Sequence, residues 1–210
     1  LLNQGHLAGT GNMIILPVDQ GFEHGPDRSF SPNPDSLDPH YMFRLAIDAG
    51  LSAYAAPLGP LEAGADTFAG QIPLILKMNS ANLMTRFAHE SSLADQAITA
   101  SLEDALHLGC VGIGFTIYPG SDNTYALFEE IRELARRAKA YGLVVIIWSY
   151  PRGNMSKAGE TALDVVSYGA HMAALLGAHI IKVKLPTAQL EYSDSPEIYA
   201  RYGKDFSTLA

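Results

Sequence analysis

Cysteine is almost absent from this chain of 210 residues, since Cys110 is the only one. A single cysteine excludes an intrachain disulfide, and it excludes any metal site that needs several thiolates. This composition fits a reducing, cytoplasmic setting, in which disulfides are rare.

Positive charge is also scarce. The chain has 14 lysines and arginines against 22 aspartates and glutamates, and its formal net charge is −8. Proteins that bind nucleic acid carry clustered cations, so this balance argues against a nucleic-acid partner. A small anionic substrate stays compatible with it, because a local basic pocket can form within an acidic protein.

Long apolar segments are missing as well. No stretch approaches the ~18 consecutive apolar residues of a membrane helix. The first residues show no basic segment followed by an apolar one, as a signal peptide would. We therefore expect no membrane partner. The sequence starts with Leu1 rather than methionine, and we expect it to begin inside a longer reading frame.

Motifs for metals and phosphates are also weak. The seven histidines are scattered along the sequence, and no HExxH motif occurs. A catalytic metal therefore has little support, although three ligands from distant strands stay an alternative. Glycine-rich phosphate cradles are missing too.

What the sequence does contain is an alternation of short apolar runs with longer helical patterns. Nearly continuous apolar runs are typical of parallel strands that are buried on both faces. Six runs occur, at residues 13–17, 51–56, 72–76, 111–116, 143–148 and 180–185. Four helices are predicted between them, at residues 38–49, 94–108, 125–141 and 160–176, each followed by a glycine. This order predicts repeated βαβ units.

Two architectures use such units, and the sequence favours the barrel. An open doubly wound sheet normally has a glycine-rich phosphate turn after its first strand. Here residues 19–26 follow that strand, with no GxGxxG motif and no predicted helix. Polar residues instead follow at least four strands, at the end where (β/α)8 barrels carry their active sites. We predict an α/β fold, a parallel (β/α)8 TIM barrel.

The strand count predicts an incomplete barrel. Eight βα units usually need ~250 residues, and a sheet of six strands would leave apolar edges exposed. We therefore interpret residues 1–210 as a single barrel domain that lacks the last two βα units, which we expect beyond Ala210.

Two lysines of the sixth predicted strand are candidate nucleophiles. Lys182 and Lys184 are two residues apart and share one face of a strand, while the apolar residues between and beside them face the other way. That places both lysines toward the barrel lumen. Desolvation and mutual repulsion lower the pKa of such an amine, and a neutral amine attacks a carbonyl carbon. The alternative is a pair of solvated or salt-bridged lysines, and spacing alone does not decide between the two.

Other candidates follow the first, third and fifth strands. Tyr150 shares a face with Trp148 and can exchange a proton with a substrate hydroxyl, although an isolated tyrosine there is more often an aromatic plug. Asp19 can orient hydroxyls or shuttle protons beside an imine, unless it is a cap or a turn residue. Lys77 can bind an anionic group or stabilise Asp19, although such a lysine is usually a surface charge. Arg152 follows Tyr150 closely.

Five blocks of the sequence resemble the DhnA-type, or archaeal-type, class I fructose-bisphosphate aldolases, most closely their bacterial branch. The blocks are residues 16–26, 76–82, 112–121, 148–153 and 177–186, and the likeness covers essentially the whole chain. The resemblance implies a (β/α)8 barrel that needs no metal or other cofactor. It also implies a Schiff base between a lysine of the sixth strand and dihydroxyacetone phosphate.

The resemblance also assigns roles to residues of this chain. By position, Lys182 is the Schiff-base lysine, Tyr150 the proton donor and Asp19 the carboxylate near the imine. We further expect substrate contacts from four side chains, Trp148, Lys184, Lys77 and Arg152. The glycine-rich phosphate-binding segments that the family has after strands seven and eight have no counterpart here, so we expect the 210-residue chain itself to be inactive.

The implied reaction is the cleavage of fructose 1,6-bisphosphate to dihydroxyacetone phosphate and glyceraldehyde 3-phosphate, in glycolysis and gluconeogenesis, by a cytoplasmic homo-oligomer. The alternative within the family is a lyase or transferase that acts on another phosphorylated ketose or keto sugar. A metal-dependent aldolase or isomerase on the same barrel, and a non-enzymatic barrel remnant, are the alternatives outside it.

Overall fold

The computed structural model describes residues 1–82, 84 and 94–201. These residues form two compact units. The first contains residues 1–82, 84, 96–115 and 137–144, and the second contains residues 94–95, 116–136 and 145–201. Within the described part of the chain, none of the helices has the length and apolar character needed to cross a membrane.

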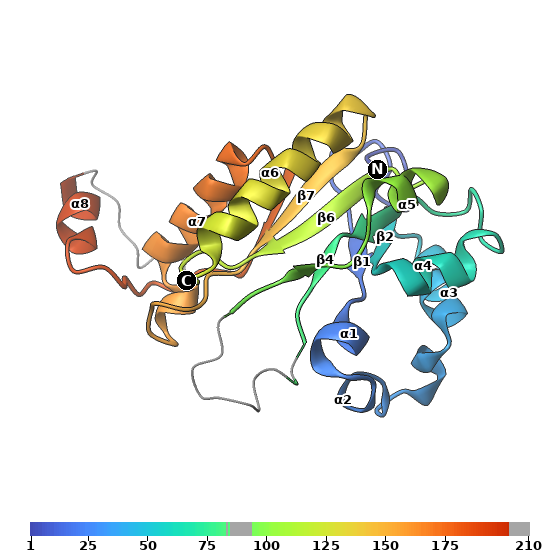
Figure 1. Ribbon diagram of the computed structural model, residues 1–210, viewed down its shortest axis with the longest axis horizontal. Coiled ribbons are helices and arrows are strands. Elements are labelled where there is room, and N and C mark those ends of the chain that lie inside the picture. Colours follow the sequence, from blue (N-terminus) through green and yellow to red (C-terminus); the bar gives the residue numbers. More distant parts are fainter. Residues whose placement is uncertain (83, 85–93, 202–210) are drawn as a thin grey trace. The chain divides into compact units, whose positions relative to one another are not determined.

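Six strands form one sheet in the order β1-β2-β3-β6-β7-β8 (Figure 1). Their bounds are Ile15–Pro17, Ala53–Ala56, Leu74–Lys77, Gly112–Ile117, Val144–Ser149 and Ile180–Val183. The pairs β1–β2, β2–β3, β3–β6 and β7–β8 are parallel. Each strand overlaps one of the six predicted apolar runs, although β3, β6 and β7 extend one residue past the end of theirs. This overlap confirms the α/β class and the parallel sheet.

Burial explains why these runs lack strict alternation. All residues of β2, β3 and β6 are buried, as expected for strands that are covered on both faces. A second, two-stranded antiparallel sheet pairs β4 (Asn79–Ser80) with β5 (Ala97–Ile98). Sequence patterns did not predict it, because two-residue strands are too short to show periodicity.

The first unit contains several short helices, of which only α3 was predicted closely. α3 (Pro39–Asp48) begins where Asp38 accepts a hydrogen bond from the backbone N–H of His40. α1 (Gln20–His24) and α2 (Pro26–Phe30) directly follow β1, so the expectation of no helix there was wrong. A 3-10 helix, η1 (Pro34–Leu37), and α4 (Leu58–Ala65) were also missed.

The helix predicted for residues 94–108 is much shorter. α5 covers Leu102–His107, because residues 97–98 belong to β5 and Ser101 starts the helix. The Ser101 hydroxyl accepts from the backbone N–H of Asp104, while the Asp104 carboxylate accepts from the backbone N–H of Ser101. This capping box fixes the first turn.

Long helices in the rest of the chain match their predictions better. α6 covers Thr124–Ala140. The helix predicted for residues 160–176 consists of a 3-10 turn, η3 (Gly159–Thr161), and then α7 (Leu163–Leu175), which contacts β8. The two are separate because Ala162 has an extended backbone. α8 (Ser195–Arg201) follows.

The core of the first unit lies where α3 and α4 contact each other. Phe43 of α3 is fully buried, stacks on Phe68 and meets the ring of Tyr54 edge-on. A Cβ atom at Gly64 of α4 would collide with the Phe43 ring. Glycine at this position therefore permits the close approach of the two helices.

Candidate active site

The second unit brings together the two residues that were predicted to act directly on carbon. β7 and β8 are paired so that Trp148 lies opposite Lys182 and Ser149 opposite Val183. Tyr150 immediately follows β7, and the Lys182 Nζ lies 5.8 Å from the centre of its ring. An amine and a phenol thus share the carboxyl end of two neighbouring parallel strands, where barrels perform their chemistry.

Lys182 is exposed, and its neighbours on β8 are only partly buried. This differs from the prediction of a desolvated lysine inside a lumen. The reason is that β8 ends the sheet order and has one neighbouring strand within the described residues. Among the described strands, only β7 therefore covers the side chains of β8 from within the sheet.

Lys184 lies one residue past the end of β8. Leu185, which was predicted to pack on helices, is 90% exposed, so that part of the prediction was wrong. The Lys184 Nζ lies 3.3 Å from the Glu160 carboxylate. The salt-bridged alternative is therefore correct for Lys184.

Glu160 binds a second lysine, Lys157, at 2.9 Å. Burial alone would raise the pKa of the Glu160 carboxyl, but the hydrogen bonds and charges of Lys157 and Lys184 outweigh it, and the pKa is lowered. Glu160 therefore stays ionised beside Lys184. Glu160 was not among the predicted site residues, because the expected helix placed it in a first turn, where acidic residues are common.

Trp148 and Arg152 occupy different surroundings around Tyr150. Trp148 is buried, with 4% of its surface exposed. The guanidinium of Arg152 lies 4.7 Å from the centre of the Tyr118 ring, and its Nη1 lies 3.4 Å from the Tyr118 hydroxyl. Tyr118, which follows β6, had not been singled out, and its ring and hydroxyl hold Arg152 in place.

The first unit brings Asp19 and Lys77 together. Lys77 ends β3 and is 2% exposed, so the alternative of a surface charge does not apply to it. Its Nζ donates to the backbone carbonyl of Asn79 at 2.6 Å and lies 3.6 Å from the Asp19 carboxylate. It lies at the same distance from the carboxylate of Glu23.

Asp19 is the residue before α1, but within the described residues its carboxylate accepts no capping hydrogen bond. Its carboxylate is directed to Lys77 instead, which decides against the cap alternative. Burial lowers the pKa of Lys77, and the charges of Glu23 and Asp19 oppose that shift. An ammonium this deeply buried needs such partners.

Glu23 was missed, although the sequence carries a signal for it. It follows Asp19 by four residues, which places both acids on one side of a helical turn. The signal could be used only with the knowledge that residues 20–24 form a helix. Gln96 donates a hydrogen bond to Glu23 at 3.3 Å from a distant part of the sequence.

Other kinds of catalytic centre have less support. Cys110 is buried, and burial raises the pKa of its thiol to about 12, which disfavours the nucleophilic thiolate. Within the described residues, no group of three or more His, Cys, Asp or Glu side chains could hold a metal ion.

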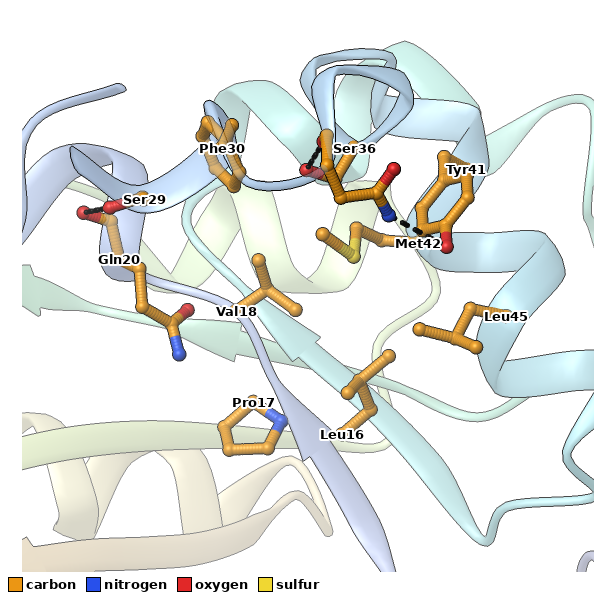
Figure 2. Close-up of a pocket in the computed structure, with 11 residues that line it drawn as sticks. Leu16, Pro17, Val18, Gln20, Ser29, Phe30, Ser36, Tyr41, Met42 and Leu45 are labelled. Atoms are coloured by element: carbon orange, nitrogen blue, oxygen red, sulfur yellow. Dashed lines mark hydrogen bonds between the residues drawn. The ribbon is translucent and has the colours of Figure 1, made fainter. Parts of the chain in front are cut away.

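A pocket of about 310 Å³ lies beside β1 (Figure 2). Leu16, Val18 and Leu45 contribute apolar walls, and Asn33 donates a hydrogen bond to the hydroxyl of Tyr41 at one side. None of the seven candidate site residues is among the described residues that line it.

Comparison with known proteins now decides the family. Residues 13–208 match the family model described as DeoC/LacD family aldolase. The chain belongs to this family. The likeness covers both groups of candidate residues, Asp19 with Lys77 and Tyr150 with Lys182.

Individual relatives are class I fructose-bisphosphate aldolases. The chain is 41% identical over 177 residues to "Fructose-bisphosphate aldolase class 1" of Thermoproteus tenax, covering 84% of this chain and 64% of that protein. It is 33% identical over 181 residues to "Fructose-bisphosphate aldolase/6-deoxy-5-ketofructose 1-phosphate synthase" of Methanocaldococcus jannaschii, covering 84% and 58%.

A solved relative shows the same fold. It is an archaeal fructose-1,6-bisphosphate aldolase with the catalytic lysine covalently bound to the carbinolamine intermediate of its substrate. The TM-score is 0.71 at 38% identity, over 80% of this chain and 63% of that one. The resemblance to archaeal-type class I aldolases and the barrel fold are thereby confirmed. The chain spans less than two thirds of the length of these three relatives.

Proposed function

We propose that this chain carries the Schiff-base site of a class I fructose-bisphosphate aldolase, with Lys182 as the nucleophile. The observation that supports it most is the position of the Lys182 amine, 5.8 Å from the ring centre of Tyr150 at the ends of paired parallel strands. The family match over residues 13–208 and the named activities of the relatives support the same reaction.

The proposed reaction uses the lysine as an electron sink. The Lys182 amine adds to the C2 carbonyl of fructose 1,6-bisphosphate, and loss of water leaves a protonated imine. When the C4 hydroxyl loses its proton, the C3–C4 bond breaks, its electron pair passes into the imine to form an enamine, and glyceraldehyde 3-phosphate leaves. Protonation of the enamine at C3 and hydrolysis of the imine release dihydroxyacetone phosphate and restore the amine.

The other candidate residues support these steps. Tyr150 exchanges the proton with the carbon skeleton, as a general acid and base beside the amine. Asp19 orients hydroxyls and balances the positive charge of the imine. Trp148, Arg152 and Lys184 contact the substrate. We assign Lys77 to Asp19 rather than to the substrate directly, because its ammonium is buried against that carboxylate.

We further propose that the reaction needs no metal, because the protonated imine itself supplies the electron sink. A cytoplasmic setting is supported by the single, buried Cys110. The homo-oligomer implied by the family resemblance stays a prediction, and so does a single barrel domain.

Borohydride trapping tests the nucleophile. The experiment uses a protein that contains this sequence in a chain as long as its relatives. The protein is incubated with fructose 1,6-bisphosphate and sodium borohydride, and its peptides are analysed by mass spectrometry. We expect a reduced adduct on the peptide that contains Lys182, and no adduct in Lys182→Met. Lys139→Met is the matched control, because this lysine is exposed in the last turn of α6 and lies outside the proposed machinery. Wild-type protein without an adduct on Lys182 contradicts the proposal.

A second function has one specific observation in its favour. The Methanocaldococcus jannaschii relative is named for two reactions, aldol cleavage and the synthesis of 6-deoxy-5-ketofructose 1-phosphate. A related lyase or transferase that acts on another phosphorylated ketose or keto sugar would use the same lysine. Such an enzyme would form a Lys182 adduct with that sugar. Its kcat/KM for fructose 1,6-bisphosphate would be far below its kcat/KM for that sugar.

A further inference from the structure

A buried cluster of three charges lies at the carboxyl ends of β1 and β3. The Lys77 ammonium sits 3.6 Å from one oxygen of Asp19 and 3.6 Å from one oxygen of Glu23. The exposed fractions of the side chains are 2% for Lys77, 23% for Asp19 and 14% for Glu23. One ammonium thus faces two carboxylates of unequal exposure.

The two carboxylates are held differently. Glu23 also accepts a hydrogen bond from the Gln96 side chain, which is buried, so Glu23 is anchored away from solvent. Asp19 is the more exposed of the two and starts α1, next to the end of β1. Asp19 is therefore the carboxylate that can meet a substrate, and Glu23 is the one that stays with Lys77.

Two carboxylates face one ammonium, and the second carboxylate has a physical consequence for Asp19. If Asp19 alone faced Lys77, any transfer of a proton to Asp19 would remove a counter-charge from a buried ammonium, which is costly. With Glu23 in place, the ammonium keeps a second acidic side chain 3.6 Å away when the charge of Asp19 changes. Asp19 is then free to interact with substrate hydroxyls.

We infer that Glu23 is a positioning residue of the aldolase site, which acts through Lys77 to set the position and charge of Asp19. This inference rests on the proposed function, because it gives Asp19 its part in the reaction. Glu23 itself touches no reacting atom. Glu23 contacts Lys77, and Lys77 in turn contacts Asp19.

A double-mutant cycle tests this role of Glu23, in the same protein that is used for borohydride trapping. The variants are Glu23→Gln, Asp19→Asn and both together, measured for kcat and KM with fructose 1,6-bisphosphate. Glutamine keeps the shape of Glu23 and an oxygen for Gln96, but it removes the charge. We expect Glu23→Gln to lower kcat at least tenfold, within the range that misplacement of a site residue produces, with KM changed less than kcat. In the Asp19→Asn background, the same change should lower kcat by less than about twofold, because coupled residues are not additive.

Matched controls separate a positioning role from a structural one. Glu133→Gln removes a surface carboxylate that is also ion-paired, with Arg136, and should leave kcat unchanged. Glu23→Asp keeps the charge and should recover part of the activity. Equal kcat losses from Glu23→Gln in both backgrounds would overturn the inference, as would a Glu23→Gln protein that fails to fold while Glu23→Asp folds.

Borohydride trapping separates this inference from the proposed function. If wild-type protein gives no adduct on Lys182, the proposed function has failed, and Glu23 has no aldolase site to position. If wild-type protein forms the adduct and turns over, while Glu23→Gln keeps the wild-type kcat, the inference alone has failed.

Discussion

Three lysines with similar positions at strand ends have three different surroundings. Lys182 is exposed beside the Tyr150 ring, Lys184 is paired with Glu160, and Lys77 is buried against two carboxylates. Lys184 lies one residue past the end of β8, where a carboxylate from another element pairs with it. The nature of each lysine is therefore set by its neighbours from other elements and not by its own strand.

Tyr150→Phe separates proton transfer from imine formation. The change keeps the ring beside Lys182 but removes its hydroxyl, and general acid–base catalysis typically contributes about 10²- to 10⁴-fold. We expect kcat for cleavage of fructose 1,6-bisphosphate to fall by about that factor, while borohydride still traps the sugar on Lys182.

The control for this variant is Tyr125→Phe, which loses a hydroxyl from a side chain that is 82% exposed on α6. It should match wild type in both assays. A Tyr150→Phe protein with wild-type kcat would show that the ring is only an aromatic plug.

At the level of elements, the strands were predictable and the short helices were not. The strands β2, β3 and β6 are buried throughout, and continuous apolar runs reveal such burial directly. Helices α1 and α2 have five residues each and contain no buried residue, so they leave no apolar period to find. The missed helices mattered, because α1 carries Glu23 toward Lys77.

The capping box of α5 gives a prediction at this scale. Ser101→Ala removes the acceptor for the Asp104 backbone N–H, and the loss of such a cap costs about 1 kcal/mol of stability. Urea unfolding of the protein should show this decrease in the free energy of unfolding with an unchanged m-value. Ser101→Asn, which can also cap, is the control and should keep most of the stability. Equal losses in both variants would mean that the serine contributes in another way.

At the scale of the whole molecule, acid sensitivity follows from how its carboxylates are placed. Several have a lowered pKa, including Asp38, Glu103 and Asp104. Asp38 and Glu103 are exposed, so solvent screens them and they contribute little to stability. Asp164 differs, because only 6% of it is exposed.

Asp164 connects the segment after β8 to the start of α7. Its carboxylate accepts hydrogen bonds from the backbone N–H groups of Val165, Glu191 and Tyr192 and from the Ser195 hydroxyl. Burial alone would raise the pKa of this carboxyl, but the bonds from Ser195 and the backbone outweigh it, so the pKa is lowered from its ordinary value. A carboxyl with a lowered folded-state pKa stabilises the protein above its unfolded-state pKa, and this contribution is lost as the pH falls through the folded-state value.

We therefore expect thermal stability to decrease as the pH is lowered from about 5 to below the Asp164 pKa, with part of the decrease due to this one group. Asp164→Asn should lower the Tm at pH 7, because the amide offers one oxygen where the carboxylate offers two to its four donors. It should also flatten the decrease at acid pH, because the variant has no carboxyl to protonate. Asp122→Asn, a control at a carboxylate that accepts from the exposed Asn154 side chain, should keep the wild-type pH dependence.

Hydrogen exchange then shows where stability is lost, since in Asp164→Asn the amides of Glu191 and Tyr192 should exchange faster while those of β7 stay protected. An Asp164→Asn protein whose Tm follows wild type across this pH range would mean that the carboxylate stabilises the segment no better than a neutral amide.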